Sequence, residues 1–279
     1  MSFLKYVECP RDAWQSLDVM IPTKEKISYL QSLLDAGFKQ LDMGSFVSAK
    51  FVPQLADTHE VLAGLDVPTN AELLCIIANE RGLERALAAP NVTSVGYPFS
   101  VNNTFQQRNT RRSVAASWSL VETMKMGAID GDLQLTVYVS MGFGNPYGDA
   151  WTPQDTADVA VRLRGLGVTR LVLADTVGTA TPDVIKDVLD LIPNAQDLGL
   201  HLHARPNDWR SKVDVGLKAG VHWFEGVLGG LGGCPFAGDA LVGNLPTEAL
   251  LPYLAHHFEV DAGMLKQLPK LKTQADSLV

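Results

Sequence analysis

The sequence lacks any long apolar run. No segment approaches the roughly 20 consecutive apolar residues that a membrane-spanning helix needs. The first residues, Met1 to Tyr6, also lack the apolar core of a signal peptide. From these two absences we expect a cytoplasmic protein that makes no contact with membranes.

Cysteine is scarce. The three cysteines, Cys9, Cys75 and Cys234, are odd in number and far apart in the chain, whereas a disulfide framework needs pairs. We therefore expect reduced thiols and a cytosolic setting. Cys9 and Cys75 are expected in the core, because cysteine is among the most buried residue types.

The sequence has fewer basic than acidic residues. Lys and Arg number 23 against 31 Asp and Glu, so the formal net charge is -8. This balance gives no electrostatic support to nucleic-acid binding or to an anionic membrane surface. An anionic small molecule stays open as a substrate, because a local arginine or a metal ion overrides the global field.

The residues that are present describe a globular protein. Apolar residues make up 46% and charged residues 19% of the 279 residues, and no linker or repeat divides the chain. We predict a single domain, 1–279, in which apolar runs alternate with amphipathic stretches. The predicted strands are 5–8, 39–43, 71–77, 92–97, 133–139, 170–174, 198–203 and 222–227. The predicted helices are 23–36, 57–65, 80–88, 114–126, 152–166, 182–191, 209–219 and 247–256.

Strand–helix units in series, with nearly continuous apolar strands, indicate a parallel sheet covered by helices. The number of units favours a closed (β/α)8 TIM barrel over an open doubly wound sheet, and the chain has the length that such barrels need. Residues 260–279 are predicted to add a short C-terminal helix or cap.

Polar residues follow the predicted strands at the end where barrel enzymes carry their active sites. Residues so distant in sequence converge only if the barrel closes. They are Arg11, Asp12, Asp42, Ser45, Asn79, Ser140, Asp175, Thr176, His201, His203, Cys234 and Asn244.

Four of these residues suit a divalent metal ion. A strand alternates its faces, so His201 and His203 aim at one side. With the carboxylate of Asp12 and the amide oxygen of Asn244 they make a shell that contains no thiolate. The alternative is that the two histidines are structural, and the expected placement of Asp12 and Asn244 at the same rim weighs against it.

Arg11 and Cys234 suggest chemistry on a carbonyl compound, in which a carbon–carbon bond is made or broken. Arg11 either pairs with Asp42 or Asp175 or serves an anionic substrate. Asp42 is interpreted as orienting Arg11 or a metal-bound water, and Asp175 alternatively caps the following turn. Cys234 lies in a glycine-rich loop of the kind that suits a mobile lid.

A basic cluster, Arg108, Arg111 and Arg112, has two interpretations. One is a solvated surface. The other is a phosphate contact for a nucleotide-bearing substrate, because the guanidinium fork matches phosphate oxygens.

Several stretches resemble the 3-hydroxy-3-methylglutaryl-CoA lyase family, within the wider group of DRE-type TIM-barrel metallolyases. The resemblance runs from about Val7 to about Leu251. The stretches are Glu8-Cys9-Pro10-Arg11-Asp12, Gly44-Ser45-Phe46-Val47-Ser48 with Val52-Pro53-Gln54, Ala174-Asp175-Thr176-Val177-Gly178, His201-Leu202-His203, and Gly232-Gly233-Cys234-Pro235 through Gly243-Asn244. Asp42 where the family has Glu, and Ala204 where it has Asp, indicate a divergent branch.

The resemblance implies a role for each of these residues. Asp12, His201, His203 and Asn244 are implied to bind Mg²⁺ or Mn²⁺. Arg11 is implied to polarise a thioester carbonyl, and Cys234 to be catalytic. His201, Asp42 and a bound water are candidates for the base. Residues assigned to substrate binding are Gln15, Ser45, Ser140, Asp175 and Thr176.

The implied reaction is a retro-aldol cleavage of 3-hydroxy-3-methylglutaryl-CoA, or of a close acyl-CoA, to acetyl-CoA and acetoacetate. The protein is then a carbon–carbon lyase that binds an acyl-CoA, and we expect a homo-oligomer, namely a dimer.

Two other functions compete with this one. A Claisen condensing enzyme of the same group joins acetyl-CoA to a 2-oxo acid, but such synthases generally carry C-terminal extensions and lack the Gly-Gly-Cys-Pro loop. A non-catalytic metal- or acyl-CoA-binding barrel is expected to have lost a ligand or the loop thiol, and the sequence retains them all.

Overall fold

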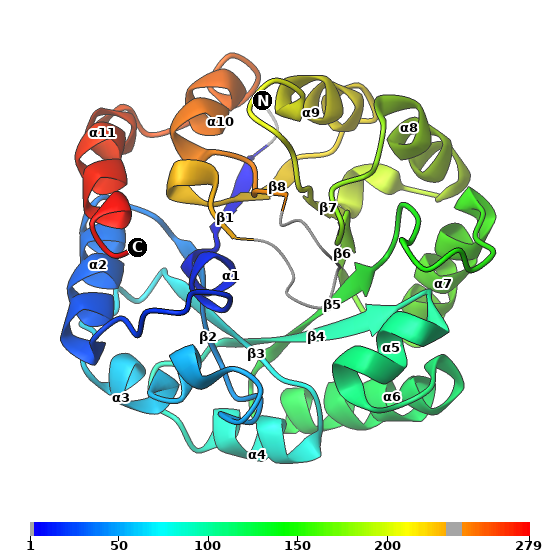
Figure 1. Ribbon diagram of the computed structural model, residues 1–279, viewed down its shortest axis with the longest axis horizontal. Helices are drawn as coiled ribbons and strands as arrows, with labels where there is room; N and C mark the ends of the chain where they lie inside the picture. Colours follow the sequence, from blue (N-terminus) through cyan, green and yellow to red (C-terminus); the bar gives the residue numbers. More distant parts are fainter. Residues whose placement is uncertain (1–2, 233–241) are drawn as a thin grey trace.

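The strands form one closed barrel. The computed structural model describes residues 3–232 and 242–279, and within them parallel strands follow one another around the barrel in chain order, with β8 beside β1 (Figure 1). The strands are β1 (Lys5–Glu8), β2 (Gln40–Ser45), β3 (Glu72–Ile76), β4 (Ser94–Ser100), β5 (Gln134–Ser140), β6 (Arg170–Ala174), β7 (Gly199–His201) and β8 (Trp223–Gly226). The predicted (β/α)8 TIM barrel is confirmed.

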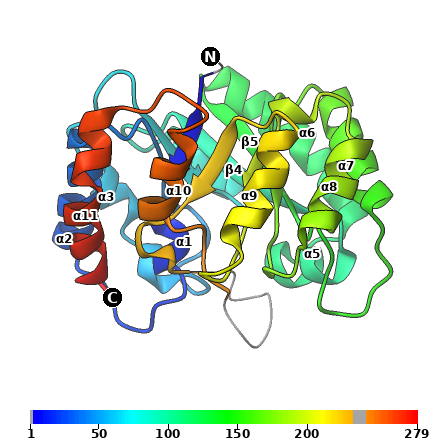
Figure 2. The same cartoon turned by 90° about the horizontal axis from the view of Figure 1, so that it is seen from above.

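Helices surround this barrel (Figures 1 and 2). In the described part of the chain none of them combines the length and the apolar character needed to cross a membrane. The α-helices are α1 (Pro10–Trp14), α2 (Thr23–Asp35), α3 (Thr58–Ala63), α4 (Glu80–Leu87), α5 (Asn103–Thr110), α6 (Val114–Asp130), α7 (Pro153–Gly165), α8 (Pro182–Leu191), α9 (Trp209–Lys218), α10 (Thr247–Leu254) and α11 (Ala262–Asp276). Short 3₁₀ helices are η1 (Pro53–Leu55), η2 (Ala195–Asp197) and η3 (Leu228–Gly230).

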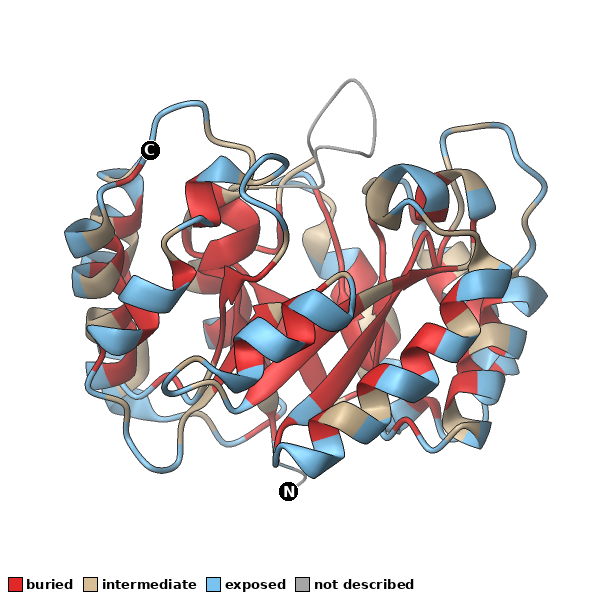
Figure 3. Cartoon of the chain, turned by 90° about the horizontal axis from the view of Figure 1, so that it is seen from below, coloured by how far each residue is buried: buried red, intermediate tan, exposed pale blue. Residues whose placement is uncertain are grey.

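Burial follows the layers of the barrel. Figure 3 shows buried strands inside a ring of helices whose outer faces are exposed. The local sequence sets where several helices begin: the side chains of Asn79, Asn102, Ser113 and Thr181 accept hydrogen bonds from the first turns of α4, α5, α6 and α8. The predicted C-terminal helix is confirmed as α11, which packs beside α2 and α10.

Three local features differ from the sequence-based expectation. Helix α1 was not predicted, because it has only five residues and all are buried, which leaves no amphipathic pattern. Helix α5 was missed because its sequence is largely polar. Strand β7 is shorter than predicted and ends at His201; His203 instead forms an antiparallel bridge with Asn244.

Gly44 allows β2 to approach α3 closely. The pairing of β2 with β3 shifts register between Asp42 and Gly44. A Cβ atom at Gly44 would lie 2.6 Å from Cγ2 of Thr58, whose hydroxyl accepts a hydrogen bond from the Ser45 backbone N–H at 3.0 Å. A larger residue would therefore displace the end of β2, which carries Asp42 and Ser45.

Glu8, the last residue of β1, is a buried carboxyl group that faces the start of α10. Its two oxygens accept hydrogen bonds from the Leu228 backbone N–H at 2.7 Å and the Thr247 hydroxyl at 2.5 Å. The largest effect on its pKa is burial, which outweighs these hydrogen bonds, and Glu248 adds repulsion; together they raise the pKa of Glu8 from 4.5 to about 8. Folding therefore favours the protonated form.

This raised pKa predicts a stability that falls with pH. Because the folded pKa of Glu8 lies above the unfolded one, its stabilising effect is complete below pH 4.5 and is lost as the pH rises toward 8. The full loss is at most about 5 kcal/mol. In Glu8→Gln this loss should be absent. The free energy of unfolding, measured in urea at pH 5 and pH 8, should therefore fall less between the two pH values in the variant than in the wild type. An equal change in the free energy of unfolding between pH 5 and pH 8 in both proteins would show that Glu8 does not titrate in this pH range.

Candidate active site

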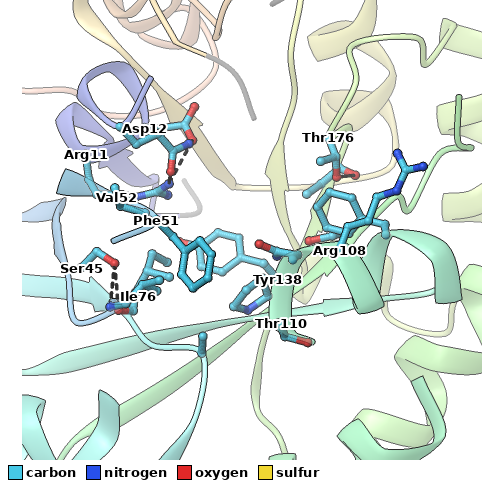
Figure 4. Close-up of a pocket in the computed structure, with 18 of the residues that line it drawn as sticks. Arg11, Asp12, Ser45, Phe51, Val52, Ile76, Arg108, Thr110, Tyr138 and Thr176 are labelled. Atoms are coloured by element: carbon cyan, nitrogen blue, oxygen red, sulfur yellow. Dashed lines mark hydrogen bonds and ion pairs between the residues drawn. The ribbon is translucent and has the colours of Figure 1, made fainter. Parts of the chain in front are cut away.

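A cavity of about 250 Å³ opens at the carboxyl ends of the strands. Among the described residues its wall combines α1, the ends of β2 to β7 and helix α5 (Figure 4). Its polar members include Arg11, Asp12, Ser45, Tyr138 and Thr176. The cavity therefore lies where the sequence predicted the site.

Three potential metal ligands converge on this cavity. One ligand atom each from Asp12, His201 and His203 lies within 4.8 Å of the others, and all three residues are buried. An ion about 2.2 Å from each of three atoms needs those atoms about 3 to 4.4 Å apart. The His-x-His pair also faces one side as predicted, with the two ring centres 5.1 Å apart.

His203 has a nitrogen prepared for a ligand. Its Nδ1 lies 3.3 Å from the Thr176 carbonyl oxygen, which can only accept, so this contact is a hydrogen bond when Nδ1 carries the proton, and Nε2 is then available to a ligand. Nε2 is buried without a hydrogen-bond partner, and it lies 3.5 Å from Oδ2 of Asp12. A buried nitrogen that faces a carboxylate is satisfied by a shared proton or by a cation that lies between them. The residues therefore fit a divalent metal ion.

Glu225 of β8 orients the other histidine. Its Oε2 accepts a hydrogen bond from Nδ1 of His201 at 2.9 Å, and its Oε1 accepts one from the Tyr138 hydroxyl at 3.4 Å. This leaves Nε2 of His201 free for an ion. Burial opposes a charge on His201, but Glu225 and Asp12 raise its pKa above the ordinary value. Carboxylate–histidine–metal chains of this kind are common in metalloproteins.

Asp12 stays ionised. Burial by itself would raise the pKa of Asp12, but the neighbouring His203, Arg11 and His201 outweigh it and hold the pKa well below the ordinary value. Its Oδ1 accepts hydrogen bonds from Arg11 at 3.0 Å and from the Gln15 amide at 2.7 Å. The carboxylate is thus fixed and charged at neutral pH.

Asn244 adjoins the same carboxylate. Its Nδ2 donates to Oδ2 of Asp12 at 2.7 Å and to the Leu231 carbonyl at 2.8 Å. Ligation by Asn244 requires the amide to turn so that its oxygen faces the ion. Its role as a fourth ligand stays a prediction.

Arg11 is held rigidly beside Asp12. Its Nε donates to both oxygens of Asp42 at 3.1 Å, Nη2 also bonds Asp42, and Nη1 bonds Asp12 and Gln15 at 3.0 Å each. Burial opposes the charge of Arg11, but the two carboxylates raise its pKa well above the ordinary value. Four of the five N–H groups are occupied by these contacts, which leaves one on Nη2 for a substrate.

The remaining predicted residues divide into two groups. Gln15, Ser45, Ser140 and Thr176 line the cavity. Asp42 and Asp175 are buried outside the described lining: Asp42 lies behind Arg11, and Asp175 is paired with Lys212 at 3.1 Å. Cys234 lies outside the described residues.

Sequence reasoning missed Glu225, Tyr138 and Lys212. Glu225 carried a usable signal, because a charged residue inside an apolar strand must face a polar partner in the lumen. Tyr138 has the pattern of an ordinary strand residue. A lysine on a helix, such as Lys212, is normally expected to be exposed to solvent.

The contact between Glu225 and His201 predicts an effect on metal affinity. Glu225→Gln keeps the shape but removes the charge that orients His201, so Mn²⁺ should bind about tenfold more weakly. Isothermal titration of metal-free protein measures this affinity. Glu72→Gln is the matched control, because Glu72 pairs with Arg170 at the other end of the barrel; an equal loss in both variants would contradict the assignment.

Fold and site together define a class, the TIM-barrel enzymes with a candidate metal centre at the carboxyl ends of the strands. The HMGL-like family matches residues 7–273. A rat protein named "3-hydroxy-3-methylglutaryl-CoA lyase, cytoplasmic" is 31% identical over 94% of this chain and 77% of its own length. This chain belongs to the HMGL-like family.

Solved structures agree with this membership. The HMG-CoA lyase from Brucella melitensis has a TM-score of 0.91 and 31% identity, and the match covers 100% of this chain and 99% of that one. An HMG-CoA lyase from Acinetobacter baumannii, solved with coenzyme A and 3-methylmalate, has a TM-score of 0.88 and 30% identity, covering 99% and 91%. The resemblance found in the sequence is confirmed, and the chain is an enzyme, a carbon–carbon lyase.

Proposed function

We propose that this enzyme cleaves 3-hydroxy-3-methylglutaryl-CoA, or a close acyl-CoA, by a retro-aldol reaction to acetyl-CoA and acetoacetate. The observation that carries the proposal is the buried, unpartnered Nε2 of His203, which faces the Asp12 carboxylate beside Arg11. Mg²⁺ or Mn²⁺ is the proposed ion, held by Asp12, His201, His203 and Asn244. These ligands are nitrogen and oxygen atoms without thiolate, which suits a hard or borderline ion.

Arg11 is proposed to stabilise the charge that develops during cleavage. When bound, the divalent ion supplies Lewis acidity that makes the substrate hydroxyl more acidic. Breaking the carbon–carbon bond then places negative charge on the thioester oxygen. The free Nη2–H of Arg11 donates to that enolate oxygen, and the salt bridges to Asp12 and Asp42 hold the guanidinium in place beforehand.

The proton transfers involve other groups. His201 is a weak candidate for the hydroxyl base, because Nδ1 bonds Glu225 and Nε2 is needed as a ligand. Asp42 has both oxygens occupied by Arg11. A water in the cavity therefore serves best as the base. Cys234 is proposed to give a proton to the enolate carbon; the chain on its N-terminal side runs past Asp12 at Gly232, where a Cβ atom would lie 2.8 Å from the Asp12 carbonyl.

The acyl-CoA character of the substrate has support outside the metal centre. Arg108 and Arg111 line the cavity, whereas Arg112 pairs with Glu80 at 3.2 Å on the surface. The guanidinium of Arg111 lies 5.6 Å from the ring of Phe51, also in the wall. The position of Arg108 and Arg111 in the wall supports a phosphate contact for these two residues, whereas the surface pair with Glu80 supports the solvated interpretation for Arg112.

Three further parts of the proposal concern the whole chain. Residues 1–279 form one catalytic domain, the enzyme is a homodimer, and it acts in the cytoplasm, as the name of the rat relative indicates for that protein. The free thiols of Cys9 and Cys75 are compatible with a reducing compartment. The molar mass from light scattering checks the dimer.

Turnover of 3-hydroxy-3-methylglutaryl-CoA with Mg²⁺ or Mn²⁺ tests the function. We expect acetyl-CoA and acetoacetate in equal amounts, with related 3-hydroxyacyl-CoA thioesters assayed in parallel to define the acyl group. Metal-loaded, folded protein that cleaves none of them contradicts the proposal. Condensation of acetyl-CoA with a 2-oxo acid would instead support the Claisen alternative.

A further inference from the structure

Lys212 is a lysine buried beneath the active site. It lies in the first half of α9 and is 2% exposed. Its Nζ donates to the His203 carbonyl at 2.7 Å, to Oδ2 of Asp175 at 3.1 Å and to the Gly178 carbonyl at 3.3 Å. A lysine ammonium has three donors, and all are used by two segments, the turn after β6 and the residues that follow β7.

These two segments carry the partners of one metal ligand. The turn from Asp175 to Gly178 is closed by the Gly178 backbone N–H, which donates to the Asp175 carbonyl at 3.1 Å. The same turn contains Thr176, whose carbonyl oxygen lies 3.3 Å from Nδ1 of His203. Lys212 therefore fixes the acceptor of that hydrogen bond on one side and the backbone of His203 on the other.

The direction of this hydrogen bond decides which nitrogen can bind an ion. When Nδ1 carries the proton toward Thr176, the lone pair lies on Nε2, which faces Asp12. A shift of the turn by a few tenths of an ångström weakens a contact that is already 3.3 Å long. The proton is then free to move to Nε2, where it blocks coordination.

We propose that Lys212 is a positioning residue that fixes the tautomer and orientation of His203 for metal binding. The inference rests on the proposed function. It also assigns a role to Asp175, whose carboxylate is the counter-charge that makes a buried ammonium tolerable at this position. Lys212 does not contact the cavity, so it acts only through the turn and through His203.

A second buried lysine provides a matched control. Lys26 of α2 is 1% exposed; it bonds the Gln54 carbonyl and Asp57, at 2.7 Å for the latter. It therefore makes the same kinds of contact as Lys212, but with η1 and the start of α3 instead of the loops of the metal centre. Lys26→Met removes a comparable buried ammonium and should lower stability without any change at His203.

The test compares Lys212→Met with Lys26→Met in metal-free protein. Long-range ¹H–¹⁵N correlation spectra of the imidazole rings report which nitrogen of His203 is protonated, and titration with Mn²⁺ reports affinity. In wild type and Lys26→Met we expect the proton on Nδ1. In Lys212→Met we expect both tautomers and about tenfold weaker Mn²⁺ binding. A folded Lys212→Met with wild-type spectra and affinity overturns the proposal.

Two additions keep the test decisive. Lys212→Met leaves Asp175 as an unpaired buried carboxylate and can fail to fold, so Lys212→Met/Asp175→Asn removes both charges and is judged by the same criteria. If the wild type itself does not bind Mn²⁺, the proposed function fails, whereas the tautomer of His203 still decides the role of Lys212.

Discussion

His203→Ala is expected to lose about a thousandfold in turnover and to bind Mn²⁺ too weakly to titrate. The substitution removes the one ligand atom that is buried without a partner, and it leaves Asp12 facing an empty space. A metal ion that stabilises developing charge contributes several kcal/mol, and about 4 kcal/mol corresponds to this loss. Steady-state kinetics at saturating Mn²⁺, together with metal titration, measures both effects.

The control for this substitution is His256→Ala. His256 is exposed beyond the end of α10 and has no place in the site. Its replacement should leave turnover and metal affinity unchanged. If His203→Ala keeps Mn²⁺ binding and turnover near the wild-type values, the metal centre has been assigned to the wrong residues.

Arg11→Lys is the second substitution with a large expected effect. A lysine has one charged nitrogen and cannot contact Asp42, Asp12 and Gln15 while it also donates to a substrate oxygen. Loss of one donor to a developing oxyanion typically costs about a hundredfold or more in turnover. We therefore expect kcat to fall by at least about a hundredfold, with the fold retained in circular dichroism.

Arg164→Lys is the corresponding control. The guanidinium of Arg164 donates hydrogen bonds to the Pro193 and Asn194 carbonyls at the surface, away from the cavity. The Arg164→Lys substitution should lower the stability slightly and leave kcat unchanged. Near-normal kcat in Arg11→Lys excludes a role for this guanidinium at the enolate oxygen.

The barrel was predictable because each strand is an apolar run between amphipathic helices. The bounds of β1, β6 and α8 agree with the prediction to the residue. The exceptions have physical causes. Helix α1 is too short to show a period, and β7 ends early because His203 pairs with Asn244, a contact between loops that no local pattern encodes.

The site was predictable to the extent that its residues follow strands. Asp12, His201 and His203 converge because the carboxyl ends of parallel strands meet at one rim. The residues that support these ligands from outside the cavity were harder to predict from the sequence. Lys212 lies on a helix, where only the tertiary structure shows that its ammonium points inward at Asp175 and the His203 carbonyl.

The dependence of activity on metal tests the central claim most directly. Protein freed of metal by a chelator is incubated with 3-hydroxy-3-methylglutaryl-CoA, and Mn²⁺ or Mg²⁺ is then added while acetoacetate is measured. The account predicts no acetoacetate before the addition and turnover afterwards, saturating at one ion per chain. Cleavage at the full rate by protein shown to be free of metal would contradict it.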